Sequence, residues 1–138
     1  MTEANRIEAL HVRAFGHPGA HGWHAADFAR ALVDDAHILV SDARGYAVAR
    51  VTLDEAELLL IAVLPEARRE GVARKLFAEL ETLLRARDVR RVFLEVVETN
   101  AAARSFYHSH GFEVSGERKN YYGRGPGHGA VLMEKALN

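Results

Sequence analysis

Apolar residues recur at helical spacing in the first part of the chain and at strand-like spacing after it. Residues 4–15 and 23–33 predict two helices, and the Gly- and Pro-containing residues 16–22 predict a loop between them. The apolar positions expected to face the core are Ile7, Leu10, Phe28, Ala31 and Leu32. Three runs of β-branched and aliphatic residues follow, and they predict strands at 37–41, 46–53 and 57–64. The third run is nearly all aliphatic, as expected of a strand that is covered on both faces.

The second half of the chain alternates between the two periodicities. Residues 72–87 predict a helix with one apolar stripe, which consists of Leu76, Leu80, Leu83 and Leu84. Residues 91–97 predict a strand, and residues 100–110 predict a helix that Gly111 ends in a left-handed conformation. Two closing strands are expected at 112–117 and 130–136, with a mobile glycine-rich loop at 123–129 between them. This order of elements predicts a mixed α/β fold.

Composition limits the classes of protein to consider. The 138 residues are the size of one compact domain, 1–138, and 49% of them are apolar, which suffices for a core without metals or crosslinks. The 18 basic and 19 acidic residues give a net charge of −1, which favours neither nucleic acid nor an anionic membrane as a partner. There is no cysteine, no apolar run that could span a membrane and no export signal in the first residues, so we expect a cytoplasmic protein.

The segment with the most chemistry joins the third predicted strand to the long helix. It reads Arg68-Arg69-Glu70-Gly71-Val72-Ala73-Arg74, with small residues where the helix begins. Free backbone N–H groups and the positive end of the helix dipole make such a junction an anion site. The loop lacks the lysine of a P-loop and the glycine triplet of a Rossmann fold, which argues against a nucleoside triphosphate. Taken alone, the segment is equally compatible with an ordinary connection that carries solvated arginines.

The stretch from Arg68 to Ala73 resembles the signature of the GNAT N-acetyltransferase superfamily, Gln/Arg-x-x-Gly-x-Gly/Ala, which cradles the pyrophosphate of coenzyme A. The order of elements fits that family from about residue 23 onward. The resemblance implies a twisted, mostly antiparallel mixed sheet flanked by helices. Members of the family usually begin with a strand, but only three residues precede the first predicted helix here, so we expect that strand to be short or absent. It also implies that acetyl-CoA is held by the loop and the preceding strand, through Ile61, Ala62, Val63, Arg68, Arg69, Glu70, Gly71, Val72, Ala73 and Arg74.

Glu95 places one carboxylate in an otherwise apolar strand. Unpaired burial would raise its pKa, as a general base for an amine requires, whereas a side chain that reaches water at the strand end would have no such role. Leu94-Glu95-Val96, Asn100 to Ala103 and Phe106-Tyr107 closely resemble the RimI-like branch of the family, the bacterial ribosomal-protein alanine N-acetyltransferases. That resemblance implies that Glu95 accepts a proton, Tyr107 donates one, and Asn100 and Ala103 contact the cofactor.

Several of these residues also have a purely structural interpretation. Tyr107 could be a core aromatic, and Asn100 could cap the following helix, a role compatible with a cofactor contact. Tyr121 and Tyr122 lie in a segment that also resembles the branch, and they are candidates for a substrate groove or for simple packing. Trp23 stands where the branch begins a helix, and it is the third candidate for substrate binding.

These features predict an enzyme that transfers an acetyl group from acetyl-CoA to a primary amine, foremost the N-terminal alanine of a ribosomal or other protein. A small-molecule amine or a lysine side chain is the alternative within the family, because the phosphate loop selects only the cofactor. A non-catalytic acyl-CoA-binding module is the alternative of another class, and Glu95 and Tyr107 argue against it. His17, His21 and His24 lack the spacing and partners of a zinc site, so we expect no metal.

Overall fold

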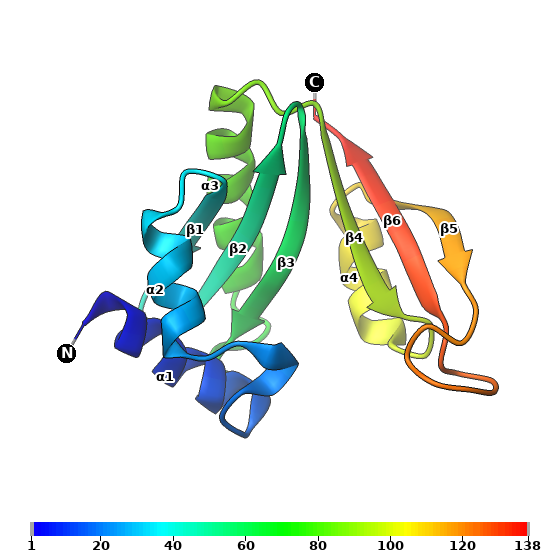
Figure 1. Ribbon diagram of the computed structural model, residues 1–138, viewed down its shortest axis with the longest axis horizontal. Helices are drawn as coiled ribbons and strands as arrows, with labels where there is room; N and C mark the ends of the chain where they lie inside the picture. Colours follow the sequence, from blue (N-terminus) through cyan, green and yellow to red (C-terminus); the bar gives the residue numbers. More distant parts are fainter. Residues whose placement is uncertain (1, 138) are drawn as a thin grey trace. The chain divides into compact units, whose positions relative to one another are not determined.

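The computed structural model describes residues 2–137, and Met1 and Asn138 lie outside that range. The chain divides into two compact units, Met1–Val89 and Arg90–Asn138, each of which contributes three antiparallel strands to a six-stranded sheet (Figure 1). The helices and 3-10 turns are α1 (Glu3–Phe15), η1 (Ala20–Gly22), α2 (Ala25–Val33), η2 (Pro65–Ala67), α3 (Val72–Ala86) and α4 (Ala101–Ser109). The strands are β1 (His37–Ser41), β2 (Gly45–Thr52), β3 (Glu55–Val63), β4 (Arg91–Val97), β5 (Glu113–Arg118) and β6 (Ala130–Ala136). The type and order of the helices and strands agree with the sequence-based expectation.

The first described element of the first unit is α1. Thr2 caps this helix, because its hydroxyl accepts a hydrogen bond from the Asn5 amide at 3.0 Å. Gly16 ends it in the left-handed conformation, with φ of 88°. The next helix, α2, begins at Ala25 rather than at Trp23, because Asp27 accepts a hydrogen bond from the His24 amide and fixes the start of the helix there.

The sheet of the first unit has the order β1-β2-β3, and it is covered on both faces. Helices α1 and α2 lie on one face and α3 on the other (Figure 1). The large side chains that these layers bury completely include Ile7, Phe28, Tyr46, Leu76, Phe77, Leu80 and Leu84. Their burial is the main favourable contribution to this half of the fold, at about 25 cal/mol for each Å² of apolar surface.

Two apolar expectations for this unit are wrong in detail. Leu32 and Leu83 are 39% and 41% exposed, although helical spacing assigns both to apolar stripes. Both flank the outer side of β1, which is the end strand of the sheet among the described residues. The third strand, β3, alternates buried and half-buried positions instead of being uniformly covered. The apolar periodicity predicted the helices correctly, but it could not predict where the sheet beneath them ends.

The second unit has the strand order β4-β6-β5, with all pairs antiparallel. Phe112, which the sequence assigns to the strand, lies just before β5 and is completely buried. Helix α4 lies beside this sheet and ends before Gly111, which has φ of 93° (Figure 1). A β-bulge in β5 falls between Val114 and Gly116, where Ser115 is the extra residue.

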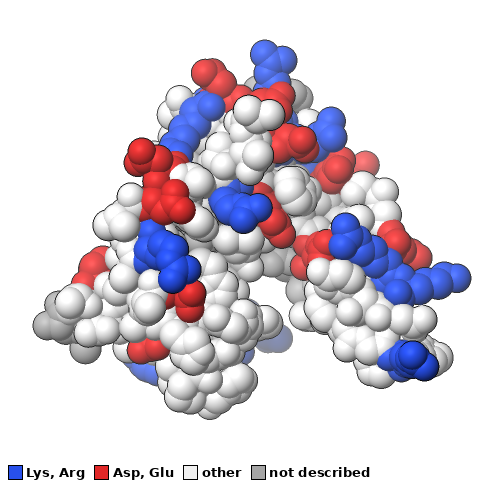
Figure 2. All heavy atoms as spheres, viewed as in Figure 1, with Lys and Arg blue, Asp and Glu red and all other residues white. Residues whose placement is uncertain are grey.

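Charged side chains of both signs are interspersed on the face that Figure 2 shows. Within residues 2–137, no helix is long and apolar enough to cross a membrane. The prediction that the whole chain is one domain stays a prediction.

Candidate active site

The junction between β3 and α3 has the geometry of an anion site. Gly71 stands at the N-cap with φ of 81°, and no side chain caps the helix. The first intrahelical bond runs from the Lys75 amide to the Gly71 carbonyl at 3.0 Å, so the amides of the preceding turn have no partner within the helix. A methyl group added at Gly71 would meet no atom within 4 Å. The space above this helix end is therefore open.

The arginines of the loop differ in what they can contribute. Arg69 and Arg74 are exposed, and Arg69 itself adopts a left-handed conformation with φ of 67°. Arg68 donates from Nε to the Val63 carbonyl at 3.3 Å and from a terminal nitrogen to the Ala14 carbonyl at 3.1 Å. Its cation thus lies at the C-terminal end of α1, where the helix dipole favours positive charge. Its side chain secures the loop, which leaves its backbone as the part expected to face a phosphate.

In β3, which leads into this loop, the backbone groups of two residues point away from β2. The Leu64 amide donates to the Arg44 carbonyl at 2.8 Å, and the register pairs Gly45 with Val63. Hydrogen-bonded and non-hydrogen-bonded pairs alternate in an antiparallel ladder, so the backbone groups of Ile61 and Val63 point away from β2. Those of Ala62 point toward β2. Of the three residues expected to pair with pantetheine, only Ile61 and Val63 have suitably directed backbone groups.

Close approach of β2 and β3 depends on one glycine. A methyl group at Gly45 would lie 2.5 Å from the Ala62 carbonyl oxygen, well inside contact distance. Farther along the same pair of strands, the register shifts between Val48 and Ala49, which leaves Leu59 as an extra residue in β3. The bulge changes the twist of β3 before the strand reaches the loop.

In the second unit, Glu95 is neither fully buried nor unpaired. Its side chain is 23% exposed, and its Oε1 lies 3.6 Å from the guanidinium of Arg118. The two residues come from β4 and β5, which pair with opposite edges of β6, so their side chains meet across β6. Arg118 also lies over the ring of Tyr121, 5.4 Å from its centroid. Glu95 thus keeps access to solvent, and no local pattern along the chain indicates its arginine partner.

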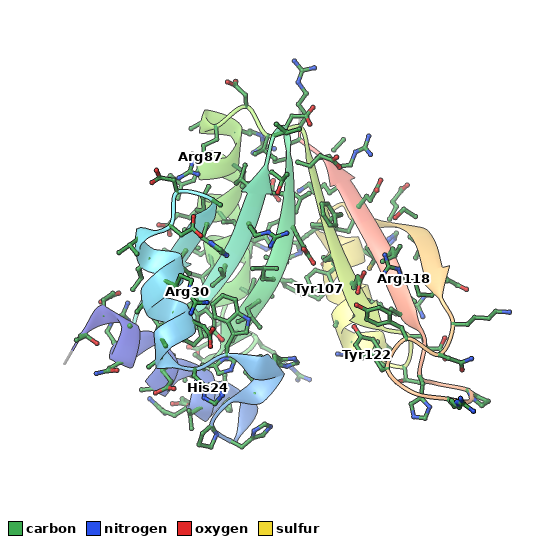
Figure 3. The ribbon with its side chains drawn as sticks, in the orientation of Figure 1. His24, Arg30, Arg87, Tyr107, Arg118 and Tyr122 are labelled. Atoms are coloured by element: carbon green, nitrogen blue, oxygen red, sulfur yellow. The ribbon has the colours of Figure 1, made fainter. Side chains whose placement is uncertain are left out.

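Tyr107 lies in α4, and its ring contacts Phe106 and Phe112 at centroid distances of 5.3 and 5.7 Å (Figure 3). Burial raises the pKa of Tyr107 to about 12, because the phenolate would be poorly solvated. The hydroxyl therefore keeps its proton at neutral pH and can act as a donor. Tyr107 is half-buried rather than part of the core, and its contacts with these rings orient the side chain without excluding an acid role.

Asn100 caps α4, because its side-chain oxygen accepts a hydrogen bond from the Ala103 amide at 3.1 Å. Ala103 is half-buried in the first turn of that helix. The structural interpretation of Asn100 is thus confirmed, and a contact of Asn100 or Ala103 with cofactor stays a prediction.

Tyr121 and Tyr122 are each 49% exposed and their rings meet edge to face, 4.9 Å apart. Burial is the main cause of a raised pKa for Tyr122, and the charge of Glu95 adds to it. The carboxylate therefore lies close enough to Tyr122 to disfavour a second negative charge. Arg118 connects the tyrosine pair to Glu95, because it contacts both the Tyr121 ring and the Glu95 carboxylate.

Glu98, which the sequence did not single out, holds the glycine-rich loop. Its Oε1 accepts a hydrogen bond from the Gly127 amide at 2.6 Å, and its own amide donates to the Gly129 carbonyl at 2.9 Å. A methyl group at Gly129 would lie 2.8 Å from the other carboxylate oxygen of Glu98. A loop that was expected to be mobile is thus secured, and the Tyr122 amide donates to the His128 carbonyl within it at 2.8 Å.

Trp23 is half-buried and packs on Phe28, with ring centroids 5.0 Å apart. Phe28 in turn contacts His11, which is completely buried and hydrogen-bonded to Tyr46 and, at 2.7 Å, to the Ala20 carbonyl. Burial lowers the pKa of His11, so this imidazole is neutral at pH 7. His11 stands four residues after Ile7, on the same face of α1 as Leu10, and this helical spacing could have indicated its place in the core.

Among residues 2–137, no group of three or more histidine and acidic side chains could hold a metal ion. The His24 ring packs against Gly19. A methyl group added at Gly19 would lie 2.6 Å from this ring.

Comparison with known proteins identifies the family. The model of the Acetyltransferase (GNAT) family matches residues 4–112. The [ribosomal protein bS18]-alanine N-acetyltransferase of Salmonella typhimurium is 43% identical over 89 residues, which cover 64% of this chain and 60% of that protein. The putative enzyme of the same name from Bacillus subtilis is 32% identical over 144 residues, 100% of this chain and 92% of that protein.

A solved structure gives the same result. The crystal structure of the ribosomal-protein-S18-alanine N-acetyltransferase from Escherichia coli superimposes with a TM-score of 0.78 at 31% identity, over 100% of this chain and 91% of that one. The match to the Salmonella protein spans only about three fifths of that relative's length. The fold, mixed α/β with antiparallel strands and flanking helices, and the family agree with the sequence-based expectation. The chain belongs to the GNAT family of acetyltransferases.

Proposed function

We propose that this protein transfers the acetyl group of acetyl-CoA to the N-terminal α-amine of a protein, with the terminal alanine of a small-subunit ribosomal protein as its foremost substrate. The similarity that carries the proposal extends over the whole chain, to the Bacillus subtilis relative and to the solved Escherichia coli enzyme. Both of those proteins have names that specify the alanine of ribosomal protein bS18 or S18 as the acceptor.

The cofactor is assigned to the β3–α3 junction of the first unit. The family uses acetyl-CoA, whose diphosphate needs hydrogen-bond donors and positive charge. The uncapped amides of Val72, Ala73 and Arg74 supply donors, and the open space at Gly71 accommodates the phosphates. The outward backbone groups of Ile61 and Val63 are placed to pair with the pantetheine amides as an added strand would.

The proton transfers are assigned to the second unit. Glu95 accepts a proton from the substrate ammonium, directly or through one water, which its partial exposure permits. The free amine then attacks the thioester carbonyl and forms a C–N bond as the C–S bond breaks. The attacking nitrogen loses its remaining extra proton as the amide forms, and Tyr107 passes a proton to the departing thiolate, so that the phenol returns to its neutral form. An α-amine has a pKa near 8 against about 10.4 for lysine, so a weak base such as a carboxylate suits an N-terminus.

The acceptor peptide is assigned to the surface that Arg118, Tyr121 and Tyr122 form around Glu95, with Trp23 as a further candidate. Exposed tyrosines offer apolar area and hydroxyl groups to an extended peptide backbone. Arg118 has two roles in this proposal, since it orients Glu95 and supports the Tyr121 ring.

A substrate panel tests the proposal. The protein is incubated with acetyl-CoA and with three acceptors: a peptide that begins with the alanine of a ribosomal N-terminus, the same peptide with a blocked N-terminus and an internal lysine, and a polyamine. Mass spectrometry should find one acetyl group on the α-amine of the first peptide only. Acetylation restricted to the lysine or the polyamine would overturn the substrate assignment, and coenzyme A binding without any turnover would favour a non-catalytic module.

A further inference from the structure

The strands of the second unit have two faces that differ in burial. Leu94 and Met133 point to one face, and each of them is only 2% exposed. Phe93, Glu95 and Leu132 alternate with these positions along β4 and β6, so their side chains point to the opposite face. All three are only half-buried. The proposed base therefore belongs to a face of the sheet that is partly open to solvent.

Leu132 is the neighbour of Glu95 across the sheet, since the register of β4 and β6 pairs the two residues directly. Three residues farther along, the Glu98 amide donates to the Gly129 carbonyl, so position 95 belongs to a pair without backbone hydrogen bonds of its own. In such a pair the Cα atoms lie about 4.5 Å apart, and the side chains approach each other most closely. The carboxylate and the leucine are thus immediate neighbours.

Gly116 of β5 gives Leu132 room to lean away from the carboxylate. It pairs with Leu132 on the edge of β6 that faces away from β4. A methyl group built at Gly116 would lie 3.3 Å from Cδ1 and 3.8 Å from Cβ of Leu132, so the leucine extends over the glycine. The φ of Gly116 lies outside the left-handed region, so the backbone does not require glycine there. The missing side chain instead leaves space that Leu132 occupies.

Polar groups occupy other positions around Glu95. The guanidinium of Arg118 lies 3.6 Å from its Oε1. Burial raises the pKa of Tyr122 and the charge of Glu95 raises it further, so this tyrosine also lies near the carboxylate. The other apolar residues on this face of β4 are two positions away along the strand. Leu132 is the apolar side chain directly opposite the carboxylate.

We propose that Leu132 determines which first residue the acceptor peptide can have, because it contacts the side chain of that residue and limits its size. This inference rests on the proposed function, in which Glu95 accepts a proton from the α-ammonium. A charge-assisted hydrogen bond holds the amine nitrogen about 2.8 Å from the carboxylate oxygen. The first Cα is bonded to that nitrogen, so the first side chain lies beside Glu95 and meets Leu132.

The size limit follows from the direction in which Leu132 leans. The methyl group of an alanine fits between the carboxylate and the leucine, whereas the branched side chain of a valine or leucine contacts Leu132. Gly116 is a positioning residue in this arrangement, since it acts on the acceptor only through the direction of Leu132.

Competition between peptides measures this limit. The acceptors share one sequence and differ only in their first residue, which is alanine, valine or leucine. Incubation of the mixture with acetyl-CoA and mass spectrometry of the products give the ratios of kcat/KM. Leu132→Ala should raise the leucine-to-alanine ratio by about tenfold or more, because a single methylene group in an apolar pocket changes kcat/KM by roughly 10- to 200-fold. Leu132→Val, a smaller change, should shift the ratio in the same direction.

Gly116→Val should have the opposite effect on selectivity. Its side chain would press Leu132 toward Glu95, so the valine-to-alanine ratio should fall below that of the parent. In the double variant Gly116→Val/Leu132→Ala, the new valine enters space that the leucine has left. The valine-to-alanine ratio should therefore return toward the parent value, and the effects of the two substitutions should not add.

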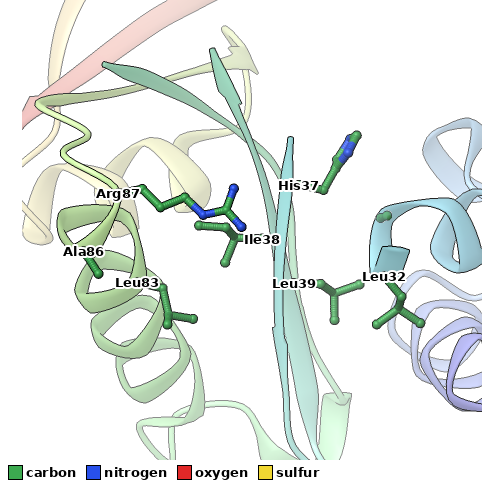
Figure 4. Close-up of a pocket in the computed structure, with 8 residues that line it drawn as sticks. Leu32, His37, Ile38, Leu39, Leu83, Ala86 and Arg87 are labelled. Atoms are coloured by element: carbon green, nitrogen blue, oxygen red, sulfur yellow. The ribbon is translucent and has the colours of Figure 1, made fainter. Parts of the chain in front are cut away.

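Leu83→Ala is the matched control, since it makes the same substitution at another partly exposed leucine. Leu83 is 41% exposed and lines a cavity of about 350 Å³ beside β1 that contains no residue assigned to acetyl transfer (Figure 4). This variant should leave both ratios unchanged. Thermal unfolding establishes that each variant is folded at the assay temperature.

The outcomes separate this inference from the proposed function. If the parent acetylates α-amines and the Leu132 and Gly116 variants keep its ratios, the role of Leu132 is overturned and the proposed function stands. A parent that acetylates no α-amine would overturn the proposed function and this inference with it. Opposite shifts in Leu132→Ala and Gly116→Val, with no shift in Leu83→Ala, are the expected result.

Discussion

Replacing Gly71 with alanine separates the conformational role of this glycine from its role in binding. Gly71 has φ of 81°, a conformation that costs an L-residue about 1–2 kcal/mol. Alanine also lowers the conformational entropy of the unfolded chain, which stabilises the folded protein by about 0.4–1 kcal/mol. The added methyl group meets no atom within 4 Å, so no steric term joins the sum. We expect a net loss of about 1 kcal/mol in the free energy of unfolding and a Tm lower by roughly 3–5 °C.

The effect on binding should be larger than the effect on stability. The methyl group of Gly71→Ala would occupy the open space over the first turn of α3, where the proposal locates the diphosphate of coenzyme A. Loss of one hydrogen bond to a charged group costs about 1.5–3 kcal/mol. The Kd for coenzyme A should therefore rise roughly 10- to 100-fold.

Gly16 provides a matched control within the same unit. It has φ of 88° at the end of α1, and a methyl group there also meets no atom within 4 Å. Gly16→Ala should lower the Tm as much as Gly71→Ala, yet leave coenzyme A binding unchanged. Calorimetric titration of both variants with coenzyme A, beside thermal unfolding, measures the two effects. Equal affinities in the parent and Gly71→Ala would refute the assignment of the phosphate site.

Four further changes test other parts of the molecule. Glu95→Gln should leave the Kd for coenzyme A unchanged while steady-state turnover falls about 10²-fold or more, and full activity would remove this carboxylate from the mechanism. Tyr107→Phe keeps the ring contacts, so turnover should drop with less than about 1 kcal/mol lost on unfolding in urea; a variant as fast as the parent would make the tyrosine purely structural. Glu98→Gln should raise the KM for the peptide more than it changes kcat, because the Gly127 amide loses a charged acceptor, and an unaltered KM would show that this contact does not shape the acceptor surface. Burial lowers the pKa of His11, so the unfolded chain takes up a proton below about pH 6.5 that the folded protein does not. Stability should accordingly fall as the pH drops through that value, and less steeply in His11→Gln; equal slopes in urea titrations would contradict this.

Local patterns along the chain were enough to predict the helices and strands. The bounds of β4 and β6 match the predicted residues, and the long helix α3 differs by one residue at its end. The place of Gly71 at the start of α3 could also be predicted from the sequence. It depends only on the glycine, the preceding arginine-rich loop and the following helix, which lie within a few positions of one another. These features involve short-range geometry, which periodicity and residue type encode directly.

Contacts between residues far apart in the chain could be found only in the tertiary structure. Arg118 reaches Glu95 because β6 is the central strand between β4 and β5, and strand order is not written in any local pattern. The contact of His11 with Tyr46 and that of Glu98 with Gly127 join residues 35 and 29 positions apart. The exposure of Leu83 depends on where the sheet ends, although its helical spacing equals that of a core residue. Local sequence thus determined which segments form helices and strands, whereas the packing of those segments decided which polar groups meet and which apolar side chains stay in water.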